Sequence, residues 1–334
     1  MRQILSCNKY KKDIMKKIFT SLTLLSFALA TYSQQDPQFS QNMFNRLSVN
    51  PGYAGSSNAI CATLLGRQQW RGFEEGPPKT YLLSVDAPVK LLHGGVGLNV
   101  IQDKIGFLSI SFANFGYAYR ASVGPGILGI GANVGILSQS INGTWRAKDD
   151  YTMDPSIPNQ SVSSTVLDAS LGFYYNIGED LYAGFSTTRL PASTATVTGG
   201  SGPSNDNLKY NFERNYYLMA GYSARLTSEI DLLPSLLAKN DGAITQLDLN
   251  CNVMFNKMVW AGLSYRTQDA LAILLGFQHS SGLKIGYAYD FTTSDMRRAS
   301  ATSKRVNTHE IMLGYCFLVP DRPKVSRHRN VRFL

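Results

Sequence analysis

Residues 126–139 read GILGIGANVGILSQ, and successive side chains in this stretch alternate in character. One parity is apolar and the other holds glycine, asparagine and glutamine, with Leu137 as the exception; the apolar members are Leu128, Ile130, Ala132, Val134 and Ile136. An extended strand places alternate side chains on opposite faces, whereas a helix would mix the two sets and its glycines would weaken it. The pattern predicts a strand with one apolar face and one small or polar face.

The same alternation recurs through most of the chain, for example in residues 167–176, 247–255, 283–292 and 309–317. Collecting such runs predicts about fourteen strands. Their ranges are 58–70, 79–88, 94–102, 108–120, 126–140, 164–177, 180–190, 212–226, 230–239, 244–256, 257–267, 269–279, 282–293 and 306–318. The fold class that this indicates is all-β.

The connections between the predicted strands separate two all-β architectures. A soluble β-sandwich would bury the apolar faces, whereas a membrane barrel would turn them toward lipid. The three long connections, 140–163, 190–212 and 293–306, are all odd-numbered, and the even-numbered connections are short. Tight turns on one side and long loops on the other are typical of outer-membrane barrels. We therefore expect a transmembrane antiparallel barrel, with tyrosines near strand ends at the membrane interfaces.

The two ends of the chain differ from the barrel region. Lys16 and Lys17 precede an apolar run, Ile18 to Ala30, and small residues follow it, which predicts a secretory signal peptide over residues 1–33, with Met15 an alternative start. Removing these residues lowers the formal net charge from +9 to +4, and the tail from Asp321 to Leu334 carries five arginine or lysine residues against one aspartate. The body is close to neutral, so the composition argues against nucleic-acid binding. We expect a barrel over 58–318 and a basic periplasmic tail over 319–334.

The polar parity of the strands contains charges of both signs, which we expect to face the lumen. They are Arg67, Arg120, Asp168, Arg225, Asp248, Arg266, Asp290 and Glu310. Such a lumen could conduct solutes, hold a plug, or close through ion pairs, and the last interpretation is favoured. The sequence suggests no catalytic, cofactor-binding or metal site, because its four histidines have no evident partners and its glycine-rich strings lie inside strands. An enzyme using His309 is the weakest alternative.

Residues 34–57 (QQDPQFSQNMFNRLSVNPGYAGSS) fit neither a strand nor a disordered linker. The segment follows the predicted cleavage site, so we expect it to begin in the periplasm. It is too short for a domain and too aromatic for a free tail. We expect Phe39, Met43, Phe44 and Tyr53 to anchor it, either at the periplasmic mouth or inside the lumen as a plug. Pro51, in the run Asn50-Pro51-Gly52, would turn the chain into the first strand.

Three cysteines follow the predicted signal peptide: Cys61, Cys251 and Cys316. This odd and sparse set resembles neither a disulfide framework nor a zinc site. Cys61 and Cys316 fall on the first and last predicted strands, which are neighbours in a closed barrel, and both have the inner parity. A disulfide across this seam is one hypothesis, and free thiols are the other.

Several motifs, in this order, resemble the PorP/SprF family. They are DPQFSQ at 36–41, NPGYAG at 50–55, RQQWRG at 67–72, GPPKT at 76–80, DKIG at 103–106, LDLN at 247–250, WAGLSYR at 260–266, LKIGYAYDF at 283–291 and HEIMLGY at 309–315. The resemblance implies an outer-membrane component of the Bacteroidetes type IX secretion and gliding machinery, with no enzymatic activity. It implies a role in export or surface attachment of proteins with C-terminal export domains, but no individual site residues.

The partners expected on this basis are other secretion or gliding components, secreted cell-surface cargo proteins and outer-membrane lipid, with no small-molecule substrate. The loops 140–163 and 190–212 would form the outer contact surface, whereas residues 34–57 and the tail would face machine parts in the periplasm. The alternative function is a general or substrate-specific porin or transporter.

Overall fold

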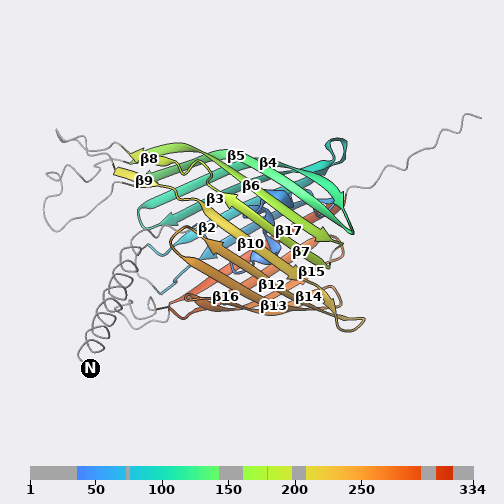
Figure 1. The fold of residues 1–334 in the computed structure, drawn as a ribbon. Helices are drawn as coiled ribbons and strands as arrows, with labels where there is room; N and C mark the ends of the chain where they lie inside the picture. The colour runs from blue at the N-terminus through green and yellow to red at the C-terminus, as the bar shows by residue number, and fades with distance from the viewer. Residues whose placement is uncertain are drawn as a thin grey trace, which may run out of the picture.

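The computed structural model describes residues 36–72, 76–142, 161–178, 180–197, 208–294 and 306–318. Fourteen antiparallel strands form the wall of a closed barrel (Figure 1). They are β1 (Ala59–Gln68), β2 (Lys79–Val89), β3 (Gly94–Ile105), β4 (Leu108–Val123), β5 (Gly126–Ile141), β6 (Val162–Ile177), β7 (Leu181–Thr188), β10 (Asn215–Tyr222), β12 (Ile230–Asn240), β13 (Thr245–Phe255), β14 (Val259–Arg266), β15 (Ala270–Gln278), β16 (Leu283–Thr292) and β17 (Asn307–Leu318). The predicted fold class and strand number are confirmed.

Two pairings close the ring. The first strand, β1, pairs with the last strand, β17, in a register that sets Cys61 opposite Cys316, and the two form a disulfide. On the other side β10 pairs with both β7 and β12. Cys251, the remaining cysteine among the described residues, is free and exposed. The disulfide hypothesis is therefore the one that the structure supports.

Side chains alternate between the two faces of the wall as the sequence predicts, with large apolar residues outward. Leu167 and Val134 are 74% and 67% exposed, whereas Asn133 and Ser170 on the same strands are buried. This is the reverse of a soluble barrel, because an outward apolar surface is stable only against lipid. Within the described residues, no helix is both long and apolar enough to span a membrane.

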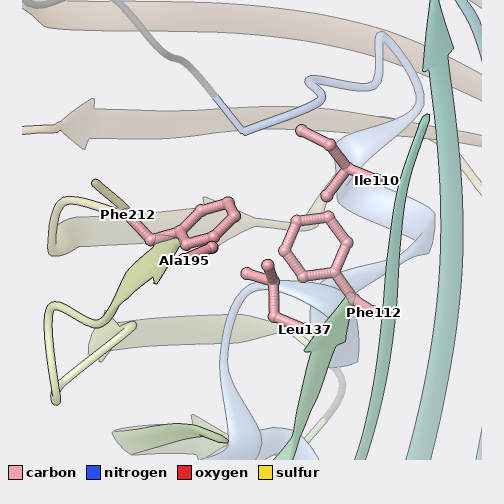
Figure 2. Packing of buried hydrophobic residues seen from close by; sticks show 5 residues of the cluster. All are labelled: Ile110, Phe112, Leu137, Ala195 and Phe212. Carbon is pink, nitrogen blue, oxygen red and sulfur yellow. The ribbon is translucent and has the colours of Figure 1, made fainter. Parts of the chain in front are cut away.

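One long connection contains structure that the sequence pattern did not predict. Within the expected loop 190–212, β8 (Thr194–Val197) and β9 (Leu208–Asn211) form a two-stranded hairpin. Ala195 of β8 and the adjacent Phe212 pack on inward side chains of β4 and β5, as Figure 2 shows. This cluster explains the exception in the β5 pattern, because Leu137 faces the lumen and is buried there at 1% exposure. Residues 143–160 of the other expected outer loop lie outside the described part of the chain.

The predicted strand 212–226 also differs in detail. It begins at Asn215 and breaks after Tyr222, leaving the two-residue strand β11 (Ala224–Arg225) at the short-turn end. A short 3₁₀ turn, η4 (Lys90–Leu92), connects β2 to β3. The predicted signal peptide over 1–33 and the basic tail over 319–334 lie outside the described residues, so both remain predictions.

The N-terminal segment forms three 3₁₀ turns inside the barrel, shown in blue in Figure 1. They are η1 (Asn42–Phe44), η2 (Arg46–Ser48) and η3 (Pro51–Tyr53). The side chain of Asn50 accepts a hydrogen bond from the Gly52 N–H at 2.9 Å and so begins η3. The rigid proline and the asparagine cap together give the turn that NPGY predicts.

Candidate functional site

We call residues 36–57 the lumen segment, because they run through the barrel from one end to the other. Asp36 contacts Arg189, which begins the long connection after β7, and Lys239, which lies at the same end of the barrel on β12. Asp36 therefore marks the long-loop end. Near the short-turn end, the Gly55 N–H donates to Asp86 at 3.1 Å. The described segment thus begins at the long-loop end, whereas the sequence led us to expect a start in the periplasm. Tertiary contacts with Asp36, invisible in the local sequence, decide this course.

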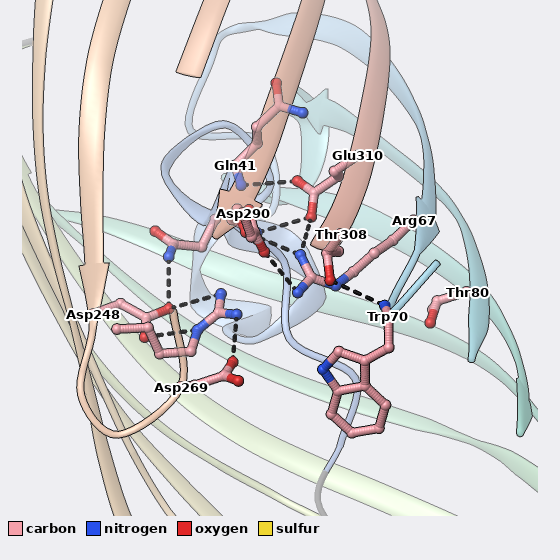
Figure 3. Close-up of polar contacts among 12 residues, drawn as sticks. Gln41, Arg67, Trp70, Thr80, Asp248, Asp269, Asp290, Thr308 and Glu310 are labelled. Carbon is pink, nitrogen blue, oxygen red and sulfur yellow. Dashed lines mark hydrogen bonds and ion pairs between the residues drawn. The ribbon is translucent and has the colours of Figure 1, made fainter. Parts of the chain in front are cut away.

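A buried ion-pair network ties the lumen segment to the barrel seam (Figure 3). Arg67 of β1 contacts Asp290 at 2.8 Å and Glu310 at 2.9 Å. Glu310 also accepts hydrogen bonds from the backbone N–H groups of Ser40 and Gln41, both at 2.8 Å. The Ser40 hydroxyl lies 2.8 Å from both carboxylate oxygens of Asp290. All five residues are at most 4% exposed, so each charge here depends on the others for its stability.

A second network continues from this one across the neighbouring strands. Arg266 contacts Asp248 at 3.1 Å and Asp269 at 3.2 Å. The Asn42 amide donates to Asp248 at 3.2 Å and its oxygen accepts a hydrogen bond from Asn250. The three consecutive polar residues Ser40, Gln41 and Asn42 therefore all bind the wall, on β13, β16 or β17.

Asp36 forms the third polar contact, at the long-loop end. Its carboxylate pairs with Arg189 and accepts hydrogen bonds from the Asn215 amide at 2.8 Å and the Tyr217 hydroxyl at 3.3 Å. Lys239 donates to its backbone carbonyl at 3.1 Å. Arg189 also lies over the rings of Phe112 and Phe212, so it joins the lumen segment to the β8–β9 hairpin.

Arg46 is the single charged residue between Pro37 and Ser57, and it fills the short-turn half of the lumen among tyrosines. Its guanidinium lies 3.8 Å from the centre of the Tyr182 ring and donates to the Tyr174 hydroxyl at 3.0 Å. Tyr53 meets Tyr174 edge to face at 5.2 Å. Aromatic rings thus stabilise the charge of Arg46, whereas carboxylates stabilise the charges of Arg67 and Arg266.

The apolar residues predicted to anchor the segment all contact the inner wall. Phe39 packs on Leu65 and Leu82, and Met43 packs on residues of β15 and β16. The Phe44 ring lies 4.8 Å from that of Trp260, which is fully buried. These contacts, with the edge-to-face pair of Tyr53, spread the segment across opposite sides of the barrel.

Inward-facing glycines allow the lumen segment to approach the wall closely. A Cβ atom on Gly129 or Gly131 would collide with the backbone of Pro51 and Gly52, and one on Gly172 would collide with Asn50. The glycine-rich inner parity of β5 therefore makes room for η3.

A vestibule of about 410 Å³ opens at the long-loop end. The lumen segment forms the floor of this vestibule, because Asp36, Pro37 and Gln38 are among the residues that line the vestibule. The side chains of Trp70, Thr80, Asp103 and Gln268 also line it. The arrangement leaves a recess with a mixed polar and apolar lining at the long-loop face. Among the described residues, no cluster of three or more histidine, cysteine, aspartate or glutamate side chains could hold a metal ion.

The residues that we expected to line the lumen fall into three groups. Arg67, Asp248, Arg266, Asp290 and Glu310 come together in the two buried networks. Asp168 lines a small cavity with Arg189, and Arg120 contacts Asn176 at 3.0 Å near the short-turn end. Arg225 is separate from these: its side chain is 69% exposed at the rim and lies 3.7 Å from Asp231.

Sequence reasoning missed several residues that hold the segment in place. Ser40, Gln41, Arg46, Arg189 and Lys239 were not among the expected contacts. One signal was present, because Arg46 is an isolated charge in an otherwise uncharged, aromatic stretch, and such a charge requires a partner when buried. Arg189 and Lys239 gave no local signal, since their partner Asp36 is more than 150 positions away.

The family comparison agrees with this architecture. Residues 31–315 match the family described as "Type IX secretion system membrane protein PorP/SprF". The chain belongs to the PorP/SprF family. It is a barrel of the outer membrane, and its family is part of the type IX secretion system. No curated protein matches the chain with significance.

Several solved structures resemble this PorP/SprF protein at low sequence identity. The CymD monoaromatic hydrocarbon channel has a TM-score of 0.44 at 12% identity, covering 87% of this chain and 95% of that chain. The Pseudomonas putida toluene transporter TodX has a TM-score of 0.44 at 10% identity, covering 82% and 93%. A Pseudomonas aeruginosa FadL homologue has a TM-score of 0.44 at 9% identity, covering 84% and 94%.

Proposed function

We propose that this barrel serves the export or the surface attachment of proteins that carry C-terminal export domains, as a non-catalytic part of the type IX secretion or gliding machinery. The observation that supports the proposal most directly is the filled lumen. Residues 36–57 occupy it from end to end, and three polar contacts hold them to opposite parts of the wall. A barrel filled in this way acts through its mouth and its outer surface.

The cargo would contact the long-loop face, where the vestibule and the β8–β9 hairpin lie. The other secretion components would contact the short-turn face and the tail over 319–334. The experiment that tests this proposal is deletion of the gene, followed by measurement of cargo proteins at the cell surface and in the medium. We expect surface-attached cargo to fall strongly while the abundance of unrelated outer-membrane proteins is unchanged. Normal export and attachment in the deletion strain would overturn the proposal.

A porin or transporter is the second candidate function, and the charged lumen is the observation that favours it. Planar-bilayer conductance distinguishes the two functions. We expect the intact barrel to show little steady conductance, because the lumen segment blocks the path. A large and stable open pore in the intact protein would favour the porin.

A further inference from the structure

A row of polar side chains crosses the outer wall next to the barrel seam. The strand register sets Lys79 opposite Lys104, and Gln68 opposite both Lys79 and His309, so the four residues share one height on β3, β2, β1 and β17. Their neighbours Thr80, Asp103, Arg67 and Glu310 are buried in the lumen, so alternation points the row outward. Each member lies near the long-loop end of its strand, at the edge of the outward apolar band.

The two lysines of this row have no opposite charge beside them among the described residues. Both are exposed, and among the described residues neither has an ion-pair partner. Like charges directly opposite each other on adjacent strands are destabilising. The carboxylates of these strands lie on the inner face, where Glu310 pairs with Arg67, Asp103 accepts a hydrogen bond from Thr80, and Asp86 accepts one from Gly55. The pair of ammonium groups therefore favours an anion from outside the chain.

An apolar groove of about 380 Å³ adjoins the row on the membrane side. It lies over the first and last strands, and its lining includes Leu64, Gly66, Tyr81, Val100, Ile311 and Leu313. Gly66 leaves the recess because it has no side chain, and the Tyr81 ring forms one edge beside it. The volume and the apolar lining suit a hydrocarbon chain.

We propose that this row and groove form a binding site for one membrane lipid with an anionic phosphate headgroup. Lys79 and Lys104 hold the phosphate, because lysine binds phosphate oxygens as a point charge. An acyl chain lies in the groove over Gly66. His309 adds a polar group to the row, and its ring is held in place by the Tyr287 hydroxyl at 2.7 Å. The lipid belongs to the leaflet that the long-loop end faces.

Native mass spectrometry of the mature barrel in detergent tests the headgroup part of the site. The probes are dioleoyl phosphatidic acid and, as a zwitterionic reference, dioleoyl phosphatidylcholine. We expect Lys79→Ser/Lys104→Ser to weaken phosphatidic acid binding by roughly tenfold to thirtyfold, because each lysine near an anionic lipid contributes measurably. Binding of phosphatidylcholine should change little. The matched control, Lys209→Ser/Lys257→Asn, removes the same charge from exposed positions elsewhere.

A second variant tests whether the ligand is a lipid and not a soluble phosphate. Gly66→Phe fills the groove and leaves the lysines in place, and its outward side chain faces lipid. We expect it to weaken phosphatidic acid binding several-fold, and we expect glycerol phosphate not to compete. Heat-modifiable migration on gels verifies that each variant is folded. Equal loss of binding in the control pair, competition by glycerol phosphate, or full binding by Gly66→Phe would each overturn the proposal.

Discussion

Arg67 illustrates how single residues stabilise the interior of this barrel. Its guanidinium meets two carboxylates, Asp290 and Glu310, and the Ser40 hydroxyl, and all four residues are at most 4% exposed. Removing one partner from a buried ion pair is costly, because the remaining charge stays desolvated and uncompensated. The same arginine therefore supports the wall and the position of the lumen segment.

We predict that Arg67→Met lowers the free energy of unfolding by about 3–5 kcal/mol, since it leaves two buried carboxylates without a cation. Urea unfolding of the barrel in detergent, followed by tryptophan fluorescence, measures this change. The control is Arg225→Met, which removes an exposed rim arginine and should change stability by less than about 1 kcal/mol. A triple variant, Arg67→Met/Asp290→Asn/Glu310→Gln, should regain part of the loss. Equal stability of Arg67→Met and wild type would contradict the prediction.

At the scale of elements, the lumen segment and strand β5 depend on each other. The inward positions of β5 are glycine where η3 approaches, and Pro51 and Gly52 occupy the space that side chains would otherwise fill. The segment is part of the barrel core, because its 3₁₀ turns pack on the inward glycines of β5 and its polar residues bind the charged side chains of the wall. The inward glycines of β5 must therefore lie at the positions where Pro51 and Gly52 approach the wall.

We predict that Gly131→Val displaces η3, because its inward side chain would overlap the Pro51 backbone. The lumen should then open, giving a several-fold rise in planar-bilayer conductance and greater protease sensitivity of residues 36–57. Ala132→Val is the matched control, since residue 132 is the outward-facing, exposed neighbour on the same strand. A folded Gly131→Val barrel with the conductance of wild type would show that the segment does not block the pore.

The whole molecule depends on one long-range closure between its first and last wall strands. β1 pairs with β17 over ten register positions, from Ala59 opposite Leu318 to Gln68 opposite His309, and the Cys61–Cys316 disulfide fixes that pairing covalently. The two cysteines are 255 positions apart, so their bond restricts nearly the whole barrel. The Arg67–Glu310 ion pair crosses the same seam from inside.

We predict that Cys61→Ser lowers stability against unfolding by an amount on the order of 5 kcal/mol at most, because the bond removes loop-closure entropy from the unfolded chain. Unfolding midpoints of oxidised wild type, reduced wild type and Cys61→Ser should show it, with the last two alike. Cys251→Ser serves as the control, since Cys251 is free. If reduction of the wild type leaves its midpoint unchanged, the seam does not depend on the disulfide.

The sequence could predict the wall because strand alternation is a local property. Leu128 to Ile136 and Leu283 to Phe291 show their two faces without reference to any other part of the chain. It could also predict that Phe39, Met43 and Tyr53 need partners, since exposed aromatic and methionine side chains are unfavourable in water. It could not predict the partners, because each lies on a strand distant in sequence.

Alternation, turn length and the family motifs by themselves determined an outer-membrane barrel of fourteen strands and, with the exception of Arg225, the inward parity of its charged residues. Tertiary structure alone decided that residues 36–57 run through the lumen, that Asp36 lies at the long-loop end, and that Cys61 bonds Cys316. The physical reason is that strand periodicity depends only on residues that are adjacent in sequence. A buried charge, in contrast, is stabilised only by the groups that closure of the barrel brings close to it.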